Sequence, residues 1–203
     1  MFLHVVRHGR TASNVAGLLD TAHPGSPLDD VGLAQAEALV ERFAETAVDA
    51  VYASDILRAV QTGTPLAAAR GLALVELAGA REILAGDQEL SSDWVPYVDM
   101  LRAWGTGRPT DLRPGGEDGV AFFGRFDAAV AGIADAGHEA AVLVTHGAAM
   151  RMWLAARVSG LAPADVIERR LGNTAVISLQ GGPGDWRLVS WDDGVLLDAN
   201  SVT

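Results

Sequence analysis

Two histidines and two arginines of this chain lie at the ends of short apolar segments, where such side chains can bind an anion. Arg7 and His8 follow the apolar run 2–6 and lead into the small polar stretch "GRTASN". Arg58 comes a few residues after a second apolar run, and His146 ends a third. Guanidinium groups bind anions strongly, since each is always charged and presents several donors. The residue types therefore indicate an anion site.

The elements that must position these residues alternate between strand-like and helical patterns. Strand-like runs are 2–6, 47–54, 72–77, 140–146, 173–180 and 186–191, the last two joined as a hairpin by "GGPGD". Helical patterns cover 29–45, 55–71, 91–104, 116–137 and 148–158. Asp29 is placed to cap the first of these helices. This alternation predicts an α/β fold, a three-layer sandwich whose mainly parallel central sheet is flanked by helices.

The predicted topology brings the candidate residues together. In an open α/β sheet, ligands bind beyond the carboxyl ends of the strands. Three separate strands would deliver their histidines and arginines to that edge. Helices that begin after Ser54 and Gly147 would add backbone N–H donors and the positive ends of their dipoles.

Length and composition favour one globular domain. The chain has 203 residues, of which 49% are hydrophobic and 20% charged, so we expect a single domain over 1–203. Residues 79–116 are irregular and rich in Gly, Pro and Asp, which predicts a small cap segment over the site. The chain contains no run of 18 apolar residues, so we expect no membrane span. The N-terminus also lacks a secretory pattern. We therefore expect a cytoplasmic protein.

Charge and residue usage exclude several classes of function. A formal net charge of −11 argues against nucleic acid or an anionic membrane as a partner. The absence of cysteine excludes disulfides, thiol nucleophiles and thiolate metal sites. All 15 basic residues are arginine, which excludes a Walker-type lysine and Schiff-base chemistry. No His and carboxylate cluster has metal-ligand spacing, so we expect neither a metal nor a cofactor.

Six motifs along the chain carry a resemblance to a known family. They are "RHGRTASN" (7–14), "PLDDVGLAQA" (27–36), "ASDILRAVQT" (53–62), "REILAGDQE" (81–89), "RPGGED" (113–118) and "VTHGAAMR" (144–151). In this order and spacing, the chain resembles the histidine phosphatase superfamily, which is phosphoglycerate-mutase-like, over nearly its whole length. The resemblance implies a phosphoglycerate-mutase-like fold.

The resemblance also implies a role for each matching residue. His8 would be the nucleophile that forms a phosphohistidine, and Glu82 would be the general acid. Other residues would surround the transferring phosphoryl group and bind its oxygens; they are Arg7, Arg58, His146, Asn14 and Gly147. Arg10 follows the "RHG" triplet closely and is a candidate substrate contact.

The sequence alone leaves several candidates for the general acid. Glu76, Asp87 and Glu89 lie near Glu82 in or beside the irregular segment. Members of the family often carry "G-x-W-E-G" after the acid, whereas this chain reads "GDQEL". We interpret this departure as an altered cap with the chemistry intact.

These observations predict a phosphatase that hydrolyses small phosphomonoesters through a phosphohistidine intermediate. The alternatives are a cofactor-dependent phosphoglycerate mutase and a non-catalytic phospho-ligand binder. Mutases of the family are typically longer, and residues 79–116 are poor in phosphate-binding groups, which favours water as the acceptor. The expected partner is a small phosphorylated substrate. The final hairpin is a candidate edge for a homodimer.

Overall fold

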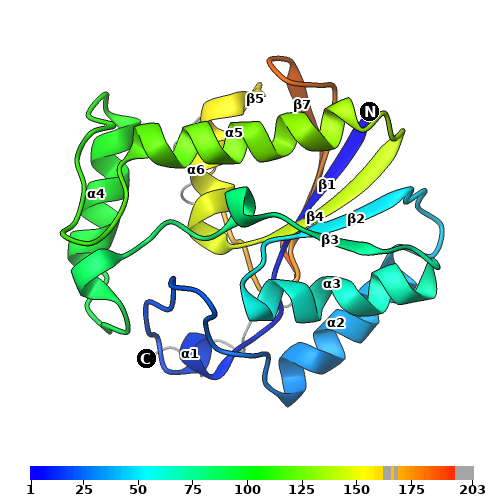
Figure 1. The fold of residues 1–203 in the computed structure, drawn as a ribbon, viewed down its shortest axis with the longest axis horizontal. Coiled ribbons are helices and arrows are strands. Elements are labelled where there is room, and N and C mark those ends of the chain that lie inside the picture. The colour runs from blue at the N-terminus through cyan, green and yellow to red at the C-terminus, as the bar shows by residue number, and fades with distance from the viewer. Residues whose placement is uncertain (162–165, 167–168, 195–203) are drawn as a thin grey trace.

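A computed structural model, which describes residues 1–161, 166 and 169–194, shows a central seven-stranded sheet (Figure 1). The strands are β1 Phe2–Arg7, β2 Ala50–Ala53, β3 Leu74–Glu76, β4 Ala140–Thr145, β5 Val158–Ser159, β6 Val176–Gln180 and β7 Trp186–Asp192. Their order across the sheet is β3-β2-β4-β1-β6-β7-β5. The first four in this order are parallel, whereas β6 is antiparallel to both β1 and β7. The predicted mainly parallel sheet is confirmed.

Helices follow most of the parallel strands. They are α1 Ala12–Val15, α2 Asp30–Arg42, α3 Leu57–Ala69, α4 Val95–Gly105, α5 Gly119–Asp135 and α6 Gly147–Arg157, with short 3₁₀ turns η1 Ala78–Ala80 and η2 Gly86–Gln88. Asp29 caps α2 as predicted, because its side chain accepts a hydrogen bond from the Gly32 amide at 2.8 Å. Among the residues that the structure describes, no helix is long and apolar enough to cross a bilayer.

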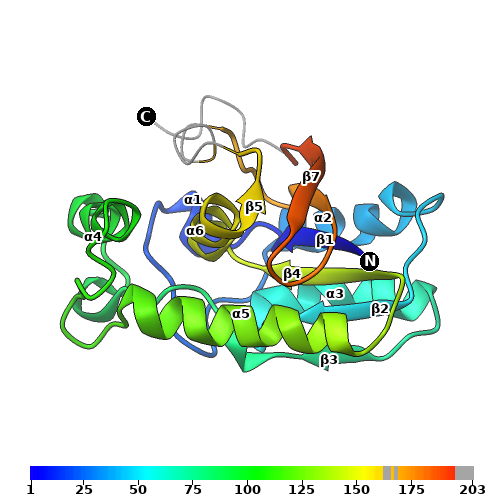
Figure 2. The same ribbon diagram turned by 90° about the horizontal axis from the view of Figure 1, so that it is seen from above.

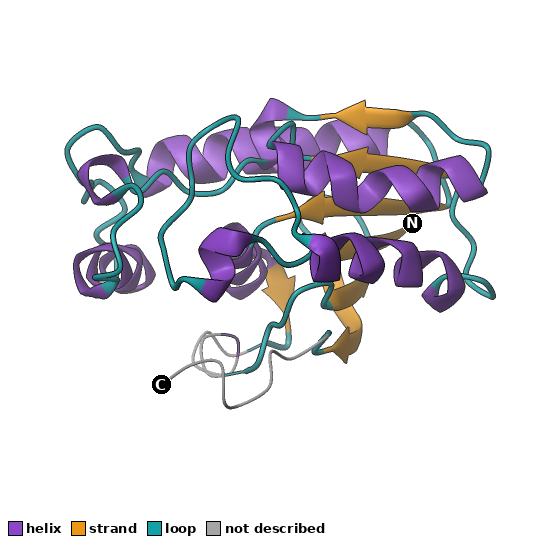
Figure 3. Ribbon diagram, turned by 90° about the horizontal axis from the view of Figure 1, so that it is seen from below, coloured by secondary structure: helices purple, strands orange, loops and turns teal. Residues whose placement is uncertain are grey.

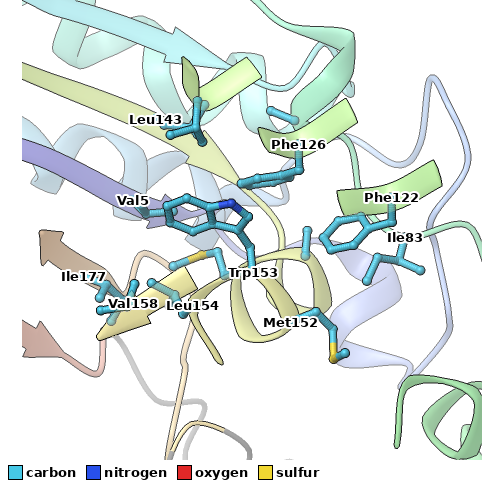
Figure 4. Packing of buried hydrophobic residues seen from close by; sticks show 14 of the residues in the cluster. Val5, Ile83, Phe122, Phe126, Leu143, Met152, Trp153, Leu154, Val158 and Ile177 are labelled. Carbon is cyan, nitrogen blue, oxygen red and sulfur yellow. The ribbon is translucent and has the colours of Figure 1, made fainter. Parts of the chain in front are cut away.

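Two hydrophobic clusters hold helices against opposite faces of the sheet. Side chains of α2 and α3 pack with Val6 of β1 and with Val142 and Val144 of β4. Side chains of α5 and α6 pack on the other face, where Trp153 is fully buried (Figure 4). Figure 3 shows helices covering the strands on the first of these faces. The three predicted layers are thus confirmed, since alternate residues of a strand face opposite sides.

The segment between β3 and α5 contains α4, which lies at the end of the molecule toward which β1 runs (Figure 2). Trp104 of α4 is buried and stacks on Phe122 of α5, with ring centroids 6.0 Å apart. Its Nε1 donates to the carbonyl oxygen of Asp111 at 2.6 Å. The predicted helix 91–104 is therefore present as α4. The division into one domain with a cap at 79–116 stays a prediction.

The C-terminal hairpin forms as predicted, with one addition that the sequence pattern did not indicate. β7 pairs through Trp186 and Arg187 with the two-residue strand β5, which directly follows α6. Part of the outer edge of β7 is therefore already paired. A homodimer through this hairpin stays a prediction.

Candidate active site

The carboxyl end of β1 places a buried imidazole at the floor of a cavity. His8 is 3% exposed, and its Nδ1 lies 2.7 Å from the carbonyl oxygen of Gly9. A carbonyl oxygen can only accept, so Nδ1 carries the hydrogen and Nε2 keeps its lone pair. The Gly9 amide in turn donates to Thr62 Oγ1 of α3 at 2.9 Å, which fixes the backbone that holds the ring.

The surroundings of His8 keep its ring neutral. Burial lowers the pKa of His8 well below its ordinary value, and the positive charges of Arg58 and Arg7 lower it further. The hydrogen bond to Gly9 acts in the opposite direction but does not outweigh them. The ring is therefore unprotonated at neutral pH, as a nucleophile must be.

Two guanidinium groups, from the half-buried Arg7 and the buried Arg58, flank the imidazole. Arg7 Nη1 donates to the carbonyl oxygen of Leu171 at 2.6 Å, and Arg58 Nη2 donates to that of Asp20 at 2.8 Å. Arg58 Nη1 also forms an ion pair with Asp20 Oδ1 at 3.5 Å. Burial lowers the pKa of Arg7 to about 10, which still leaves it charged at neutral pH. Both arginines line the cavity.

Each of these arginines keeps a buried N–H group for a ligand. Arg7 Nε and Arg58 Nη1 have no hydrogen-bond partner within the part of the chain that the structure describes. Buried donors are normally paired, so both positions fit the oxygens of a bound anion. Gly147 permits the close approach of Arg7, since a Cβ there would lie 3.3 Å from Arg7 Nε. Gly25, with φ +70°, does the same for Arg58, because a Cβ would lie 2.5 Å from Nη1.

A second histidine lies behind the first. His146 is fully buried, its ring centroid lies 5.3 Å from that of His8, and its Nε2 lies 2.9 Å from Ser54 Oγ. Burial lowers the pKa of His146 well below its ordinary value, with Arg58 adding to the effect. Its Nδ1 is buried without a hydrogen-bond partner among the described residues. The structure thus brings together the two predicted histidines, but only His8 is among the residues that line the cavity, and a contact of His146 with the phosphoryl group stays a prediction.

Glu82 is the one of the four candidate acids that lines the cavity. Its Oε1 accepts from the amides of Ile83 and Ala149, both at 2.8 Å, and its Oε2 accepts from that of Ala148 at 3.0 Å. The amides of Ala148 and Ala149 belong to the first turn of α6, where a carboxylate is favoured. Oε2 makes only one of these bonds, which leaves it a site for a proton.

The other three acids have different surroundings. Asp87 forms a bidentate ion pair with Arg113, and Glu89 accepts hydrogen bonds from the amides of Thr21 and Ala22. Glu76 ends the edge strand β3. None of the three is among the residues that line the cavity.

Asn14 lines the cavity with its oxygen already engaged. Its Oδ1 accepts from the Thr11 amide at 3.2 Å and from Asn173 Nδ2 at 3.1 Å, so its amide group remains to donate. Asn173 also donates to the carbonyl oxygen of His8 at 3.1 Å. Asn173 could not be predicted as a site residue, because nothing in its neighbourhood along the chain indicates a contact with β1. Arg10 instead pairs with Asp29 at 2.8 Å and lies outside the cavity lining.

Beyond this polar floor, the cavity of about 470 Å³ is mostly apolar. Its larger apolar lining residues are Leu18, Leu19, Trp94, Val98, Leu101, Met152 and Leu171. Arg102 and Arg151 also line it, and both are engaged elsewhere: Arg102 pairs with Asp99, and Arg151 donates to the carbonyl oxygen of Val166. Within the described ranges, no three His, Asp or Glu side chains are grouped to hold a metal ion.

Acid should destabilise the folded protein through the two histidines of the site, His8 and His146. Both have a pKa below the value of about 6.5 that an unfolded chain gives them, so the unfolded state binds more protons as the pH falls below 6.5. We expect the free energy of unfolding to fall by about 2 to 3 kcal/mol between about pH 7.5 and about pH 5.5. Urea denaturation across this range measures it, and a flat profile would contradict the assigned neutral rings.

Comparisons with known proteins agree with this geometry. The model of the histidine phosphatase superfamily (branch 1) matches residues 3–194. PE-PGRS family protein PE_PGRS11 of Mycobacterium tuberculosis is 34% identical over 92% of this chain, which spans only 35% of that protein. Phosphoglycerate mutase-like protein 4 of Arabidopsis thaliana is 32% identical over 93% of this chain and 84% of its own length.

A solved structure extends the likeness to three dimensions. The structure of a mycobacterial glucosyl-3-phosphoglycerate phosphatase, in complex with VO3, superposes with a TM-score of 0.77 at 26% identity. The likeness covers 94% of this chain and 98% of that one. The buried imidazole and its paired arginines thus lie on a fold shared with a known phosphatase. Because the family model covers nearly all of the sequence, the chain belongs to the histidine phosphatase superfamily, branch 1.

Proposed function

We propose that this protein hydrolyses small phosphomonoesters through a phosphohistidine at His8. The observation that carries the proposal is a neutral imidazole whose Nε2 lone pair is free, flanked by two arginines. Each arginine keeps a buried N–H group that has no hydrogen-bond partner among the described residues. Such an arrangement can attack phosphorus and stabilise the negative charge of the transferring group at the same time.

The first step would transfer the phosphoryl group to the enzyme. His8 Nε2 forms a bond to phosphorus while the ester P–O bond breaks, and the leaving oxygen takes a proton from Glu82 Oε2. Arg7, Arg58 and the Asn14 amide donate to the phosphoryl oxygens. The second step reverses these roles: Glu82 accepts a proton from water, the water oxygen bonds to phosphorus and the P–N bond breaks. Inorganic phosphate leaves, and both side chains return to their starting states.

The lining of the cavity favours water as the acceptor and an apolar group on the substrate. A mutase must hold a second phosphate, yet the walls outside the floor are mainly Leu, Val, Met and Trp side chains. The two arginines on these walls are engaged, Arg102 with Asp99 and Arg151 with the carbonyl oxygen of Val166. We therefore propose substrates whose alcohol portion is apolar enough to contact Val98, Leu101 and Met152. The mutase and the non-catalytic binder remain the alternatives.

One experiment separates the three. The protein is incubated with p-nitrophenyl phosphate and, separately, with 3-phosphoglycerate plus a trace of 2,3-bisphosphoglycerate. Release of inorganic phosphate supports hydrolysis, and a wider panel of phosphorylated metabolites then identifies the preferred alcohol. Isomerisation without phosphate release would establish the mutase, and no reaction with either substrate would favour the binder.

Replacing the general acid should affect poor leaving groups most. Glu82→Gln keeps the size of the side chain but removes the proton that the leaving oxygen takes. We expect kcat/KM for phenyl phosphate to fall by about 10²–10⁴-fold, the usual contribution of general acid catalysis. The loss should be smaller with p-nitrophenyl phosphate, because p-nitrophenolate leaves without full protonation. Equal losses on both substrates would argue against the acid role of Glu82.

A further inference from the structure

The segment that carries Glu82 is held by side chains from other parts of the fold. Residues 79–84, which we call the acid segment, begin in η1 and continue without helix or strand. Even so, each backbone carbonyl oxygen from residue 79 to residue 83 accepts a hydrogen bond from a side chain distant in the sequence. Since an irregular backbone has no partners of its own, these side chains determine where Glu82 lies.

Arg125 of α5 supplies three of these five bonds. Its Nη1 donates to the carbonyl oxygens of Gly79 at 2.9 Å and of Arg81 at 2.8 Å. Its Nη2 donates to the carbonyl oxygen of Glu82 itself at 3.0 Å. One rigid, planar guanidinium therefore fixes the backbone on both sides of the general acid.

Glu117 holds this guanidinium in place. Arg125 Nε donates to Glu117 Oε2 at 2.8 Å, and Arg125 Nη2 donates to Glu117 Oε1. The same Oε1 accepts from the amide of Leu84 at 3.1 Å, so the pair contacts the acid segment at both of its ends. With side chains only 24% and 11% exposed, this ion pair is largely shielded from solvent.

The remaining two carbonyls connect the acid segment to the sheet and to the cavity wall. Thr145 Oγ1, at the end of β4, donates to the carbonyl oxygen of Ala80 at 2.7 Å. The hydroxyl of Tyr97, from α4, donates to that of Ile83 at 2.9 Å. Tyr97 itself lines the cavity, whereas Arg125 does not. Figure 4 shows Ile83 beside Phe122, one turn before Arg125 on α5.

We propose that Arg125 is a positioning residue for Glu82, an inference that rests on the proposed function. The Glu82 carboxyl can meet the amides of Ala148 and Ala149 only while its backbone stays in place. Without Arg125, three carbonyls lose their donors and the acid segment relaxes, so the proton is no longer delivered along the direction of the leaving oxygen. Misplacing a catalytic group by about 1 Å can cost about 10²-fold in rate.

The test is the dependence of kcat/KM on the leaving group in Arg125→Met. We expect a loss of about 10²-fold with phenyl phosphate, and of less than about tenfold with p-nitrophenyl phosphate, whose leaving group needs little protonation. A merely structural role would lower both equally. In the double variant with Glu82→Gln, Arg125→Met should add no further loss, since both changes remove the same proton transfer.

Milder variants and a matched control keep the outcome clear. Arg125→Lys and Glu117→Gln should show the same selectivity for phenyl phosphate with smaller losses, even if Arg125→Met folds poorly. Arg157→Met is the control, because Arg157 also pairs bidentately with an acid of α5, Asp127, but lies outside the cavity lining. It should leave both rates unchanged.

Two results would overturn the inference. The first is an equal loss on both substrates in the Arg125 and Glu117 variants, or losses that multiply with that of Glu82→Gln. The second is a Glu82→Gln enzyme without leaving-group selectivity, which would remove the acid role and the inference together. This second result arises before any Arg125 variant is made, so the two failures are distinguishable.

Discussion

His8→Ala should lower kcat on the order of 10⁶-fold, the loss seen when a covalent nucleophile is removed. The substitution deletes the atom that bonds to phosphorus, and no other side chain at the cavity floor can replace it. The ring of His146 lies 5.3 Å away, centroid to centroid, and is already engaged with Ser54. Steady-state release of phosphate from p-nitrophenyl phosphate measures the loss.

Trapping the phosphohistidine intermediate is an independent test of the same prediction. A radiolabelled phosphomonoester, quenched in alkali during turnover, should leave label on the wild-type protein and none on His8→Ala. His138→Ala is the matched control, because His138 is a half-buried imidazole that contacts Tyr52 and lies outside the cavity lining. It should retain both activity and label. Label that persists in His8→Ala would place the nucleophile elsewhere.

Arg58→Met should lower kcat/KM by about 10³–10⁵-fold, the range for an arginine that stabilises charge on a transferring phosphoryl group. Methionine retains an unbranched apolar side chain in a site that is 2% exposed, but it removes the donor at Nη1. It also leaves Asp20, whose side chain is only 8% exposed, without its cationic partner. That carboxylate would then repel the incoming phosphate.

Kinetics and inhibition by vanadate together measure the effect of Arg58→Met. Vanadate should bind more weakly in proportion to the lost rate, because it adopts the geometry of the transferring phosphoryl group. Arg70→Met is the control from the other end of α3, where Arg70 donates to the backbone carbonyl oxygens of Phe43, Ala44 and Thr46. A loss of less than about tenfold in Arg58→Met would show that Arg58 does not carry transition-state charge.

Much of the fold could be predicted because burial and periodicity agree in the central strands. All six residues of β4 are buried, which matches the unbroken apolar run read from the sequence. β5 could not be predicted, because two residues after a helix form a strand only where β7 offers a partner. The four-residue helix α1 depends on the reciprocal capping bonds between Thr11 and Asn14, a contact too local for periodicity to indicate.

The residues of the site also divide into those that the local sequence indicates and those that only tertiary contacts reveal. His8 and His146 could be placed because each directly ends a strand, and the carboxyl ends of parallel strands share one edge. Glu82 is distinguished from the other three acids by the hydrogen bonds that its carboxylate accepts from the amides of Ala148 and Ala149, which are distant in the sequence. The support that Asn173 gives to His8, and that Arg125 gives to Glu82, comes entirely from tertiary contacts.

The antiparallel strand β6 beside β1 has a consequence for synthesis of the protein. Arg7 is anchored by the carbonyl oxygen of Leu171, and the backbone of His8 by Asn173, which precedes β6. A nascent chain therefore contains Arg7 and His8 long before these anchors are synthesised, because Leu171 and Asn173 follow them by 164 and 165 residues. We therefore expect the geometry around His8 to form only after this later segment has left the ribosome.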